Sequence, residues 1–308
     1  MKKARPLLII IVLLLLGAYA YGSWFFAGVL VDSPARALEE AAASSEQTPQ
    51  SVGLPAPTDV SFQNGDITLR GWYFDNELDG QCGVVLLHGY TGTRYNMLRY
   101  APLFWPRGCD LLMYDARGHG ASDGRYHTFG YYEKGDAEAA VDWLEAQTGL
   151  PQSHIGMLGI SYGAGTALQT APLLPDLAFI IADSPYADLE TIMRYQAVQQ
   201  YGQAVNMMIP GAWVAAEAMA DFDVAAVSAV TAVAQAQMPI MLIHSQADEY
   251  TPPSNSEAIY ANSDHGRTVL YLTDWGSSHG ADITNNYAGF AQYVDEFLQT
   301  YAPDFGRH

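Results

Sequence analysis

Short, wholly apolar segments alternate with helical segments through most of this chain. Unbroken apolar segments of this length are typical of strands that are buried on both faces. Helical segments between such strands supply the crossovers of a parallel sheet. The pattern therefore predicts an α/β fold with a mostly parallel central sheet flanked by helices. The predicted strands cover residues 84–87, 111–114, 155–159, 179–182, 240–244 and 268–272.

Two further features refine this fold. Residues 58–63 and 67–74 flank Asn64-Gly65, a dipeptide that favours a tight hairpin turn, so we expect two antiparallel strands before the parallel ones. Between residues 184 and 238 no strand is predicted, and this insertion is longer than a connection requires. We expect a helical cap over about 187–237, with an ordinary pair of packing helices as the alternative.

The N-terminal segment has a different character. Every residue from 7 to 31 is uncharged and most are strongly apolar, which is enough for a helix that crosses a bilayer. The basic residues Lys2, Lys3 and Arg5 precede it, which favours an N-terminus inside and the remaining chain outside. A signal peptide cleaved near Ala20, with a secreted product, is the alternative.

These features divide the chain into three parts. We predict a transmembrane signal anchor over 1–31 and a linker over 32–57, where Ala, Ser, Pro and acidic residues dominate. A short helix over 35–43 is expected within this linker. The folded domain with its helical cap is expected over 58–308, on the extracytoplasmic side of the membrane.

Charge and cysteine content narrow the function further. The formal net charge is −19, so the body should repel nucleic acid and anionic membrane surfaces. Cys82 and Cys109 each stand just before a predicted strand. If those strands are parallel neighbours, an exported location permits a disulfide between them, with two separate buried thiols as the alternative.

Two segments match the G-x-S-x-G pattern of a nucleophile elbow, in which a serine sits on a sharp turn between a strand and a helix. They are GISYG at 159–163 and GSSHG at 276–280. Ser161 has the required context, because a predicted strand runs directly into it and a predicted helix leaves it. Ser278 lacks this context, since three residues separate its GSSHG motif from the preceding strand. The sequence therefore predicts Ser161 as the nucleophile.

The acid and the base are expected at the same edge of the sheet. Ligands of open α/β sheets bind at the carboxyl ends of the strands. Asp248 and His279 each follow a predicted strand and come after Ser161, in the order Ser, acid, His of hydrolases. Asp183 also follows a strand and is the alternative acid. His265 precedes its strand and is therefore expected at the wrong end.

The oxyanion of the reaction should be held by backbone N–H groups. One is expected from Tyr162, directly after the nucleophile, and the other from Tyr90 in the loop after strand 84–87. His88 is predicted to be structural. His119 and Ser122 are predicted to belong to the architecture of the loop 115–122 rather than to catalysis.

Together these segments resemble the α/β-hydrolase superfamily, over roughly residues 58–301. The likeness is greatest to capped esterases that are exported or membrane-anchored, to monoglyceride-lipase-like enzymes and to the serine-aminopeptidase-like group. The resemblance implies a triad of Ser161, Asp248 and His279. Ser245 departs mildly from the pattern, because many relatives have Gly there. The segments that carry the likeness are HGYTG (88–92), DARGHGAS (115–122), GYYEKGD (130–136), GISYG (159–163), ADSPY (182–186), HSQADEYTPP (244–253) and SSHG (277–280).

The expected function is that of a serine hydrolase which cleaves carboxylic esters, of small or acylglycerol-like molecules, through an acyl-enzyme intermediate. The chemistry calls for no metal and no organic cofactor. A serine peptidase or amidase that reads a free N-terminus is the first alternative, and it would need a buried carboxylate in the cap. The candidates for this carboxylate are Glu190, Glu217, Asp221 and Asp223. A non-catalytic binding protein is the second alternative.

Overall fold

A computed structural model describes residues 4–32, 34–78 and 81–306. Its centre is an eight-stranded sheet with the order β1-β2-β4-β3-β5-β6-β7-β8. Strand β2 runs antiparallel to β1 and β4, and the remaining pairs are parallel. The predicted fold class is thereby confirmed. The strands are β1 Thr58–Asn64, β2 Ile67–Phe74, β3 Gly83–Leu87, β4 Asp110–Asp115, β5 Ile155–Ile160, β6 Phe179–Asp183, β7 Ile240–Ser245 and β8 Thr268–Thr273.

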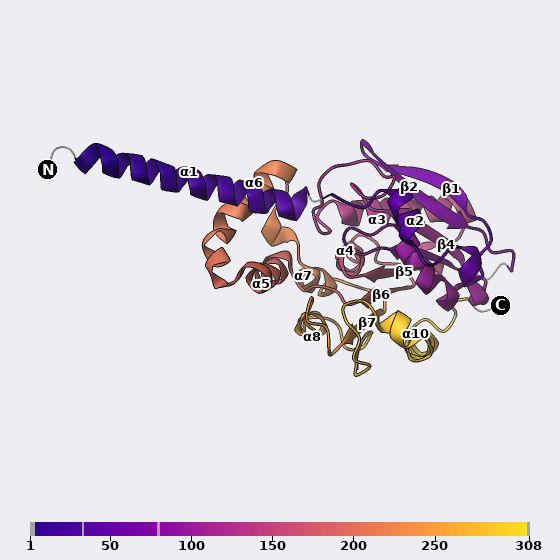
Figure 1. Cartoon of the computed structure of the whole chain (residues 1–308). Helices are drawn as coiled ribbons and strands as arrows, with labels where there is room; N and C mark the ends of the chain where they lie inside the picture. Colours follow the sequence, from indigo (N-terminus) through magenta and orange to yellow (C-terminus); the bar gives the residue numbers. More distant parts are fainter. Residues whose placement is uncertain (1–3, 33, 79–80, 307–308) are drawn as a thin grey trace.

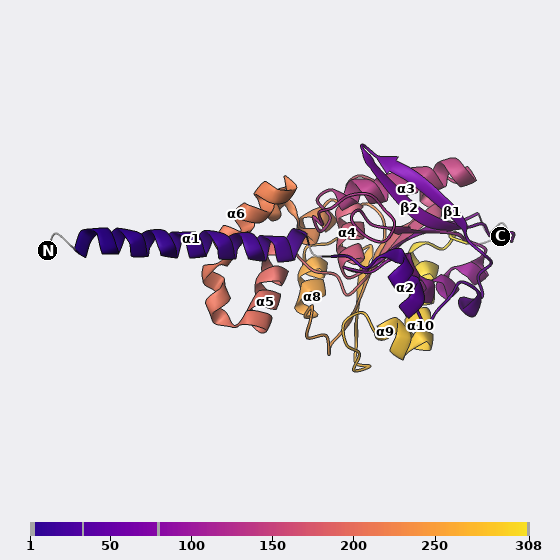
Figure 2. The same ribbon diagram turned by 45° about the horizontal axis from the view of Figure 1, so that its top comes forward.

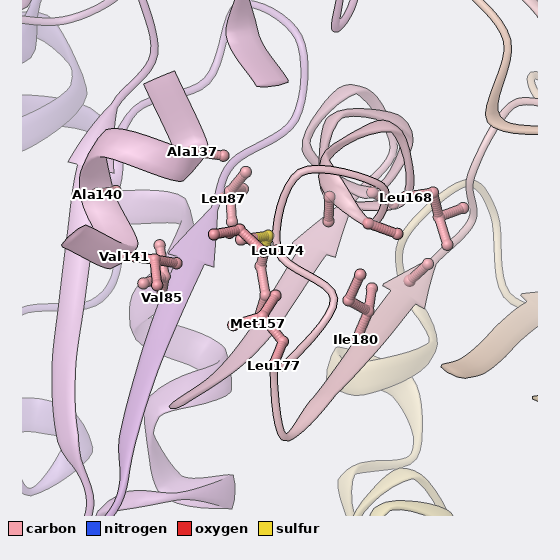
Figure 3. Close-up of a cluster of buried hydrophobic side chains, with 14 of the residues drawn as sticks. Val85, Leu87, Ala137, Ala140, Val141, Met157, Leu168, Leu174, Leu177 and Ile180 are labelled. Atoms are coloured by element: carbon pink, nitrogen blue, oxygen red, sulfur yellow. The ribbon is translucent and has the colours of Figure 1, made fainter. Parts of the chain in front are cut away.

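Both faces of the sheet carry a hydrophobic core, because successive side chains of a strand point to opposite faces. In β3, Val85 and Leu87 pack under α3 (Glu133–Thr148) and α4 (Tyr162–Thr170). Figure 3 shows these side chains against the helices. Val84 and Leu86 point the other way, toward a core that also includes side chains of α10 (Tyr287–Tyr301). This two-sided burial explains why the strands read as unbroken apolar runs.

The segment between β3 and β4 is helical but takes a tighter form than an α-helix. It consists of 3-10 turns, η2 (Arg94–Leu103) and η3 (Trp105–Arg107). Pro102 lies within η2 and has no N–H to donate to a regular helix. The buried Arg94 at the start of η2 donates to Asp115 at 2.8 Å and 3.2 Å, which holds the segment against the end of β4.

Helices occupy the insertion between β6 and β7. They are α5 (Leu189–Tyr201), η5 (Gln203–Met207), α6 (Ile209–Ala220), η6 (Val224–Ala226) and α7 (Ala229–Val233). We call residues 187–237 the cap segment. Two helices outside it were not predicted, α8 (Ser254–Ala261) and α9 (Asp282–Asn285), because each is too short for a clear hydrophobic period.

The N-terminal helix α1 (Ala4–Val31) extends away from the sheet and lies beside α6 (Figures 1 and 2). By length and composition, its segment Leu7–Val31 could cross a membrane, and it is one such segment among the described residues. Residues Lys2 and Lys3, on which the predicted orientation depends, lie outside the described residues.

The segment between α1 and β1 contains the helix α2 (Leu38–Ser44), three residues beyond the start of the expected 35–43 helix, and the turn η1 (Gln50–Val52). Leu54 is buried in the core on the η2 side of the sheet. The end of this segment therefore packs on the domain rather than running free of it.

Cys82 and Cys109 form a disulfide, with Cα atoms 4.6 Å apart. They precede β3 and β4, which are parallel neighbours, so both sulfur atoms lie at the same end of the sheet. Of the two alternatives left by the sequence, the structure contains the disulfide.

Loss of this disulfide should destabilise the domain. The two cysteines are 27 residues apart, and the entropy of closing such a loop predicts a loss of about 3.5 kcal/mol. Urea unfolding of the protein with and without a reductant measures this difference. The double variant Cys82→Ser/Cys109→Ser should match the reduced protein and not respond to the reductant; equal stability of reduced and oxidised wild type would contradict the prediction.

Candidate active site

Ser161 lies on the turn between β5 and α4, with φ +53° and ψ −114°. A positive φ is uncommon for a residue with a side chain and indicates local strain. The glycines on either side explain how so sharp a turn is accommodated. A Cβ at Gly159 would lie 2.2 Å from the carbonyl oxygen of Gly163, and a Cβ at Gly163 would lie 2.3 Å from that of Leu87. Side chains at either position would push the strand and helix apart.

The structure brings Ser161, His279 and Asp248 into one hydrogen-bonded chain. His279 Nδ1 lies 2.6 Å from Asp248 Oδ2, and His279 Nε2 lies 2.7 Å from Ser161 Oγ. A carboxylate can only accept, so Nδ1 carries the proton and donates to Asp248. Nε2 is then free to accept the hydrogen bond from the Ser161 hydroxyl. This protonation state is the one in which an imidazole acts as a base toward serine.

Asp248 is held by donors on both of its oxygens. Its Oδ1 accepts hydrogen bonds of 2.9 Å from the backbone amides of Tyr250 and Thr251. Burial opposes ionisation of this carboxyl group, but the hydrogen bonds from His244 and His279 outweigh it and hold the pKa of Asp248 well below its usual value. Asp248 is therefore ionised and can stabilise a positive charge on His279.

His244 is a contact of this site that the sequence did not reveal. Its Nε2 lies 2.7 Å from the Thr251 carbonyl oxygen and 3.2 Å from Asp248 Oδ2, and its Nδ1 lies 2.7 Å from Ser256 Oγ. The residue is the fully buried end of β7, where a histidine would be taken for part of the core. Its proximity to Asp248 comes from the turn after β7, which no pattern in the sequence specifies.

The backbone amides predicted for the oxyanion also lie near Ser161. Tyr162 is the first residue of α4, where helix N–H groups have no partner within the helix. Tyr90 follows Gly89, at which a Cβ would lie 3.7 Å from the Ser161 Cβ. Tyr90 and Tyr162 line the same cavity as Ser161. Their part in binding an oxyanion stays a prediction.

The alternative acid is engaged elsewhere. Asp183 is buried and accepts hydrogen bonds from Tyr100, at 2.7 Å, and from Ser184, at 2.8 Å. Burial is the largest influence on this carboxyl group and raises the pKa of Asp183, although both hydroxyl donors act in the opposite direction. Asp183 thus binds Tyr100 and Ser184 at the end of β6. The described side-chain hydrogen bonds of His279 go to Asp248 and Ser161 instead.

The other polar residues singled out from the sequence hold loops. His88 Nε2 accepts from the Ala116 amide, and His119 Nε2 accepts from the Thr91 amide. Burial lowers the pKa of both imidazoles, which agrees with their acting as acceptors. Ser122 donates to the Asp115 carbonyl oxygen at 2.5 Å. These contacts tie the loops after β3 and β4 together beside the site.

A mostly apolar cavity of about 270 Å³ opens from Ser161 between the sheet edge and the cap segment. Aromatic and aliphatic side chains of α5 and α6 line it, including Ile192, Met193 and Trp213. Phe26, Val29 and Leu30 of α1 line it as well, which sequence reasoning missed. The apolar composition of residues 1–31 predicts a membrane anchor but gives no sign that this segment also borders a cavity. No described residue that lines the cavity is acidic.

The candidate carboxylates of the cap segment lie outside this cavity. Glu190, Asp221 and Asp223 are exposed, and Glu217 is half-buried and accepts from the Val224 amide. Within residues 4–32, 34–78 and 81–306, no group of three or more His, Cys, Asp or Glu side chains is arranged to hold a metal ion.

Comparison with known proteins places the chain in a family. A family model described as X-Pro dipeptidyl-peptidase (S15 family) matches residues 28–212, more than half of the chain, and the chain belongs to this family. The uncharacterized protein YqkD of Bacillus subtilis is 31% identical over 220 residues, 70% of each chain. The uncharacterized protein YfhR of Salmonella typhimurium is 26% identical over 263 residues, 80% of this chain and 84% of that protein.

Solved structures share the fold. An esterase of Pyrococcus furiosus superposes with a TM-score of 0.70 at 23% identity, over 88% of this chain and 98% of that one. An acylaminoacyl peptidase of Pyrococcus horikoshii superposes with a TM-score of 0.62 at 17% identity, over 82% of this chain and 42% of that one. With the family match, these neighbours make the chain a serine hydrolase of the α/β type, within the α/β-hydrolase superfamily.

The close approach at Gly163 gives a direct test of the turn. Because a Cβ there would meet the backbone oxygens of Leu87 and His88 at 2.3 Å and 2.6 Å, Gly163→Ala should lower the free energy of unfolding by about 1–3 kcal/mol. It should also displace Ser161 and reduce its labelling by a fluorophosphonate. Gly17→Ala is the control, since a Cβ at Gly17 would meet nothing within 4 Å. Unchanged unfolding and labelling of Gly163→Ala would contradict the account of the turn.

Proposed function

We propose that this chain hydrolyses carboxylic esters through an acyl-enzyme intermediate on Ser161, with His279 as the general base and Asp248 as the acid that orients it. The observation that carries the proposal is the hydrogen-bonded chain from Asp248 through His279 to Ser161, at the mouth of an apolar cavity. The resemblance of the whole domain to an esterase fold supports it.

The reaction follows from the positions of the three side chains. Ser161 Oγ attacks the ester carbonyl carbon while its proton passes to His279 Nε2. Collapse of the tetrahedral intermediate breaks the bond to the alcohol oxygen, which leaves with that proton. Water then attacks the acyl group with His279 as base, and the acid product leaves Ser161. The ionised Asp248 stabilises the imidazolium in both steps.

The amides of Tyr90 and Tyr162 are proposed to bind the oxyanion. Their location beside Ser161 supports this role, and backbone donors at a helix N-terminus suit a developing negative charge. Preorganised donors of this kind need no rearrangement when the charge forms.

The composition of the cavity favours an ester over a peptide with a free N-terminus. Recognition of an ammonium group in a buried site requires a carboxylate partner. The described lining of the cavity contains none, and the candidate carboxylates of the cap segment lie elsewhere. A serine peptidase remains the second candidate, because the family model is described as a dipeptidyl-peptidase and one structural neighbour is a peptidase.

We also propose that α1 anchors the protein in a membrane, with the hydrolase domain on the extracytoplasmic side. The apolar length of α1 and the disulfide between Cys82 and Cys109 support an exported domain. Cleavage near Ala20, which would release a secreted protein, is the alternative. The substrate is proposed to be a small-molecule acyl ester, and nucleic acid is not an expected partner of so acidic a chain.

The two serine motifs allow a matched test. Ser161→Ala should abolish fluorophosphonate labelling and reduce ester hydrolysis by roughly a million-fold, because the nucleophile is lost. Ser278→Ala removes a serine from the second G-x-S-x-G match, which is exposed in the loop that carries His279. It should retain both labelling and most activity. Labelling that persists in Ser161→Ala would refute the assignment of the nucleophile.

Substrate panels separate the two candidate functions. Because the cavity is apolar and its described lining has no acidic residue, p-nitrophenyl esters of medium chain length should be cleaved with a higher kcat/KM than aminoacyl p-nitroanilides. The Ser161→Ala variant supplies the background for both series. A preference for an anilide with a free amino group would favour the peptidase instead.

A further inference from the structure

The last turns of α1 are packed into the protein. Gly211 of α6 approaches α1 so closely that a Cβ there would lie 2.1 Å from Ser23 Oγ. The Phe26 ring meets the Tyr201 ring of α5 edge to face, with centroids 5.2 Å apart. Small residues at a helix crossing allow such close approach of two backbones. Helix α1 and the cap segment therefore form one packed unit, visible side by side in Figures 1 and 2.

The C-terminal end of α1 also accepts hydrogen bonds from loops beside the candidate active site. The Tyr90 hydroxyl donates to the Leu30 carbonyl oxygen at 3.2 Å, and the His127 amide donates to the Val31 carbonyl oxygen at 2.9 Å. These contacts satisfy carbonyl groups at the C-terminus of a helix, where no partner exists within the helix. They link α1 to the residue whose own amide is proposed to bind the oxyanion.

Helix α1 is one wall of the substrate cavity. Phe26, Val29 and Leu30 face the same space as Ser161, and the opposite walls come from α5 and α6. The cavity of about 270 Å³ is just below the usual range of roughly 300–1,000 Å³ for ligand pockets. An apolar cavity of this volume suits a single alkyl chain better than a lipid with two chains.

The length of α1 brings this cavity to the membrane. Residues 7–18 are exposed and precede Tyr19, which lies against Gly211 of α6; at about 1.5 Å per residue they rise about 18 Å. A hydrocarbon core of about 30 Å is therefore not spanned before α1 reaches its contacts with the cap segment. The following turn exposes Trp24 and Phe25, and the cap segment exposes Met207 and Val214. Aromatic residues at this depth are typical of the membrane interface.

We propose that the active site takes a single-chain acyl ester directly from the bilayer, and that α1 is both the membrane segment and a wall of the acyl-binding site. The proposal rests on the ester hydrolase function proposed above. The alkyl chain lies between α1 and the cap segment, and the ester carbonyl reaches Ser161. Hydrolysis releases the fatty acid and the alcohol, with one water consumed.

The role of α1 as a wall of the cavity can be tested by replacing either of two valines of α1 with tryptophan. Val29 and Val12 are exposed to 41% and 45%, but only Val29 lines the cavity. The full chain is reconstituted in phosphatidylcholine vesicles and given 4-methylumbelliferyl oleate in the bilayer or 4-methylumbelliferyl butyrate in water. Val29→Trp should lower the ratio of oleate to butyrate turnover roughly tenfold or more, because the added ring fills the chain site.

Val12→Trp should leave both rates unchanged. Equal ratios in Val29→Trp and Val12→Trp would overturn the role of α1 as a wall. Absence of Ser161-dependent butyrate hydrolysis in the wild type would instead refute the proposed function.

A measurement on the wild-type chain covers the case in which Val29→Trp does not fold. A fluorophosphonate with a long alkyl chain that ends in a diazirine is attached to Ser161 in vesicles and then illuminated. Peptides that contain residues 26–30 should be crosslinked, together with peptides of α5 or α6. Crosslinks confined to other parts of the chain would overturn the proposal, and failure to label Ser161 would refute the nucleophile assignment.

Entry of the substrate from the bilayer can be tested with a charged substitution on the cap segment. Val214 and Leu78 are exposed to 67% and 66%, but only Val214 lies on the cap segment beside α1. Val214→Asp should lower turnover of the oleate ester in vesicles severalfold and spare turnover of the butyrate ester, because a carboxylate opposes contact with the bilayer. Leu78→Asp should affect neither. Equal oleate turnover in the two variants would overturn entry from the bilayer.

Discussion

The turn at Ser161 is the constraint on which the active site depends. A strand that enters the turn and a helix that leaves it must approach within van der Waals distance, which is possible only because Gly159 and Gly163 have no side chains. The result is a serine with positive φ at the carboxyl edge of the sheet. Its hydroxyl is then within reach of His279, which arrives from the loop after β8. Parallel strands thus bring distant parts of the chain to one edge.

A second group of contacts holds His279, the proposed base, in place. Asp248 receives two backbone amides and two imidazole nitrogens, so its carboxylate is fixed in position and in charge. That fixed charge determines which nitrogen of His279 carries the proton. His244 adds a donor from the end of β7. The arrangement therefore controls protonation as well as geometry, and it does so mainly with groups that are buried.

In the proposed arrangement, the cap segment and α1 extend the same site toward the membrane. Apolar residues of α5, α6 and α1 line the cavity beside Ser161. Because the strongly apolar helix α1 also borders this cavity, the proposed attachment to a membrane and the proposed binding of substrate depend on the same helix. Leu54 packs in the core and so holds the end of the segment that connects α1 to β1 against the domain.

The sequence by itself determined the sheet, because strands buried on both faces must be apolar throughout, and it singled out Ser161, Asp248 and His279 by their places after strands. The boundaries of the strands agreed with the structure to within one or two residues. Only the tertiary structure decided between a disulfide and two thiols, brought His244 to Asp248, and turned Phe26, Val29 and Leu30 toward the cavity. Each of these depends on contacts between segments far apart in the chain. Local hydrophobic periodicity reports which residues are buried, but it does not report against what they are buried.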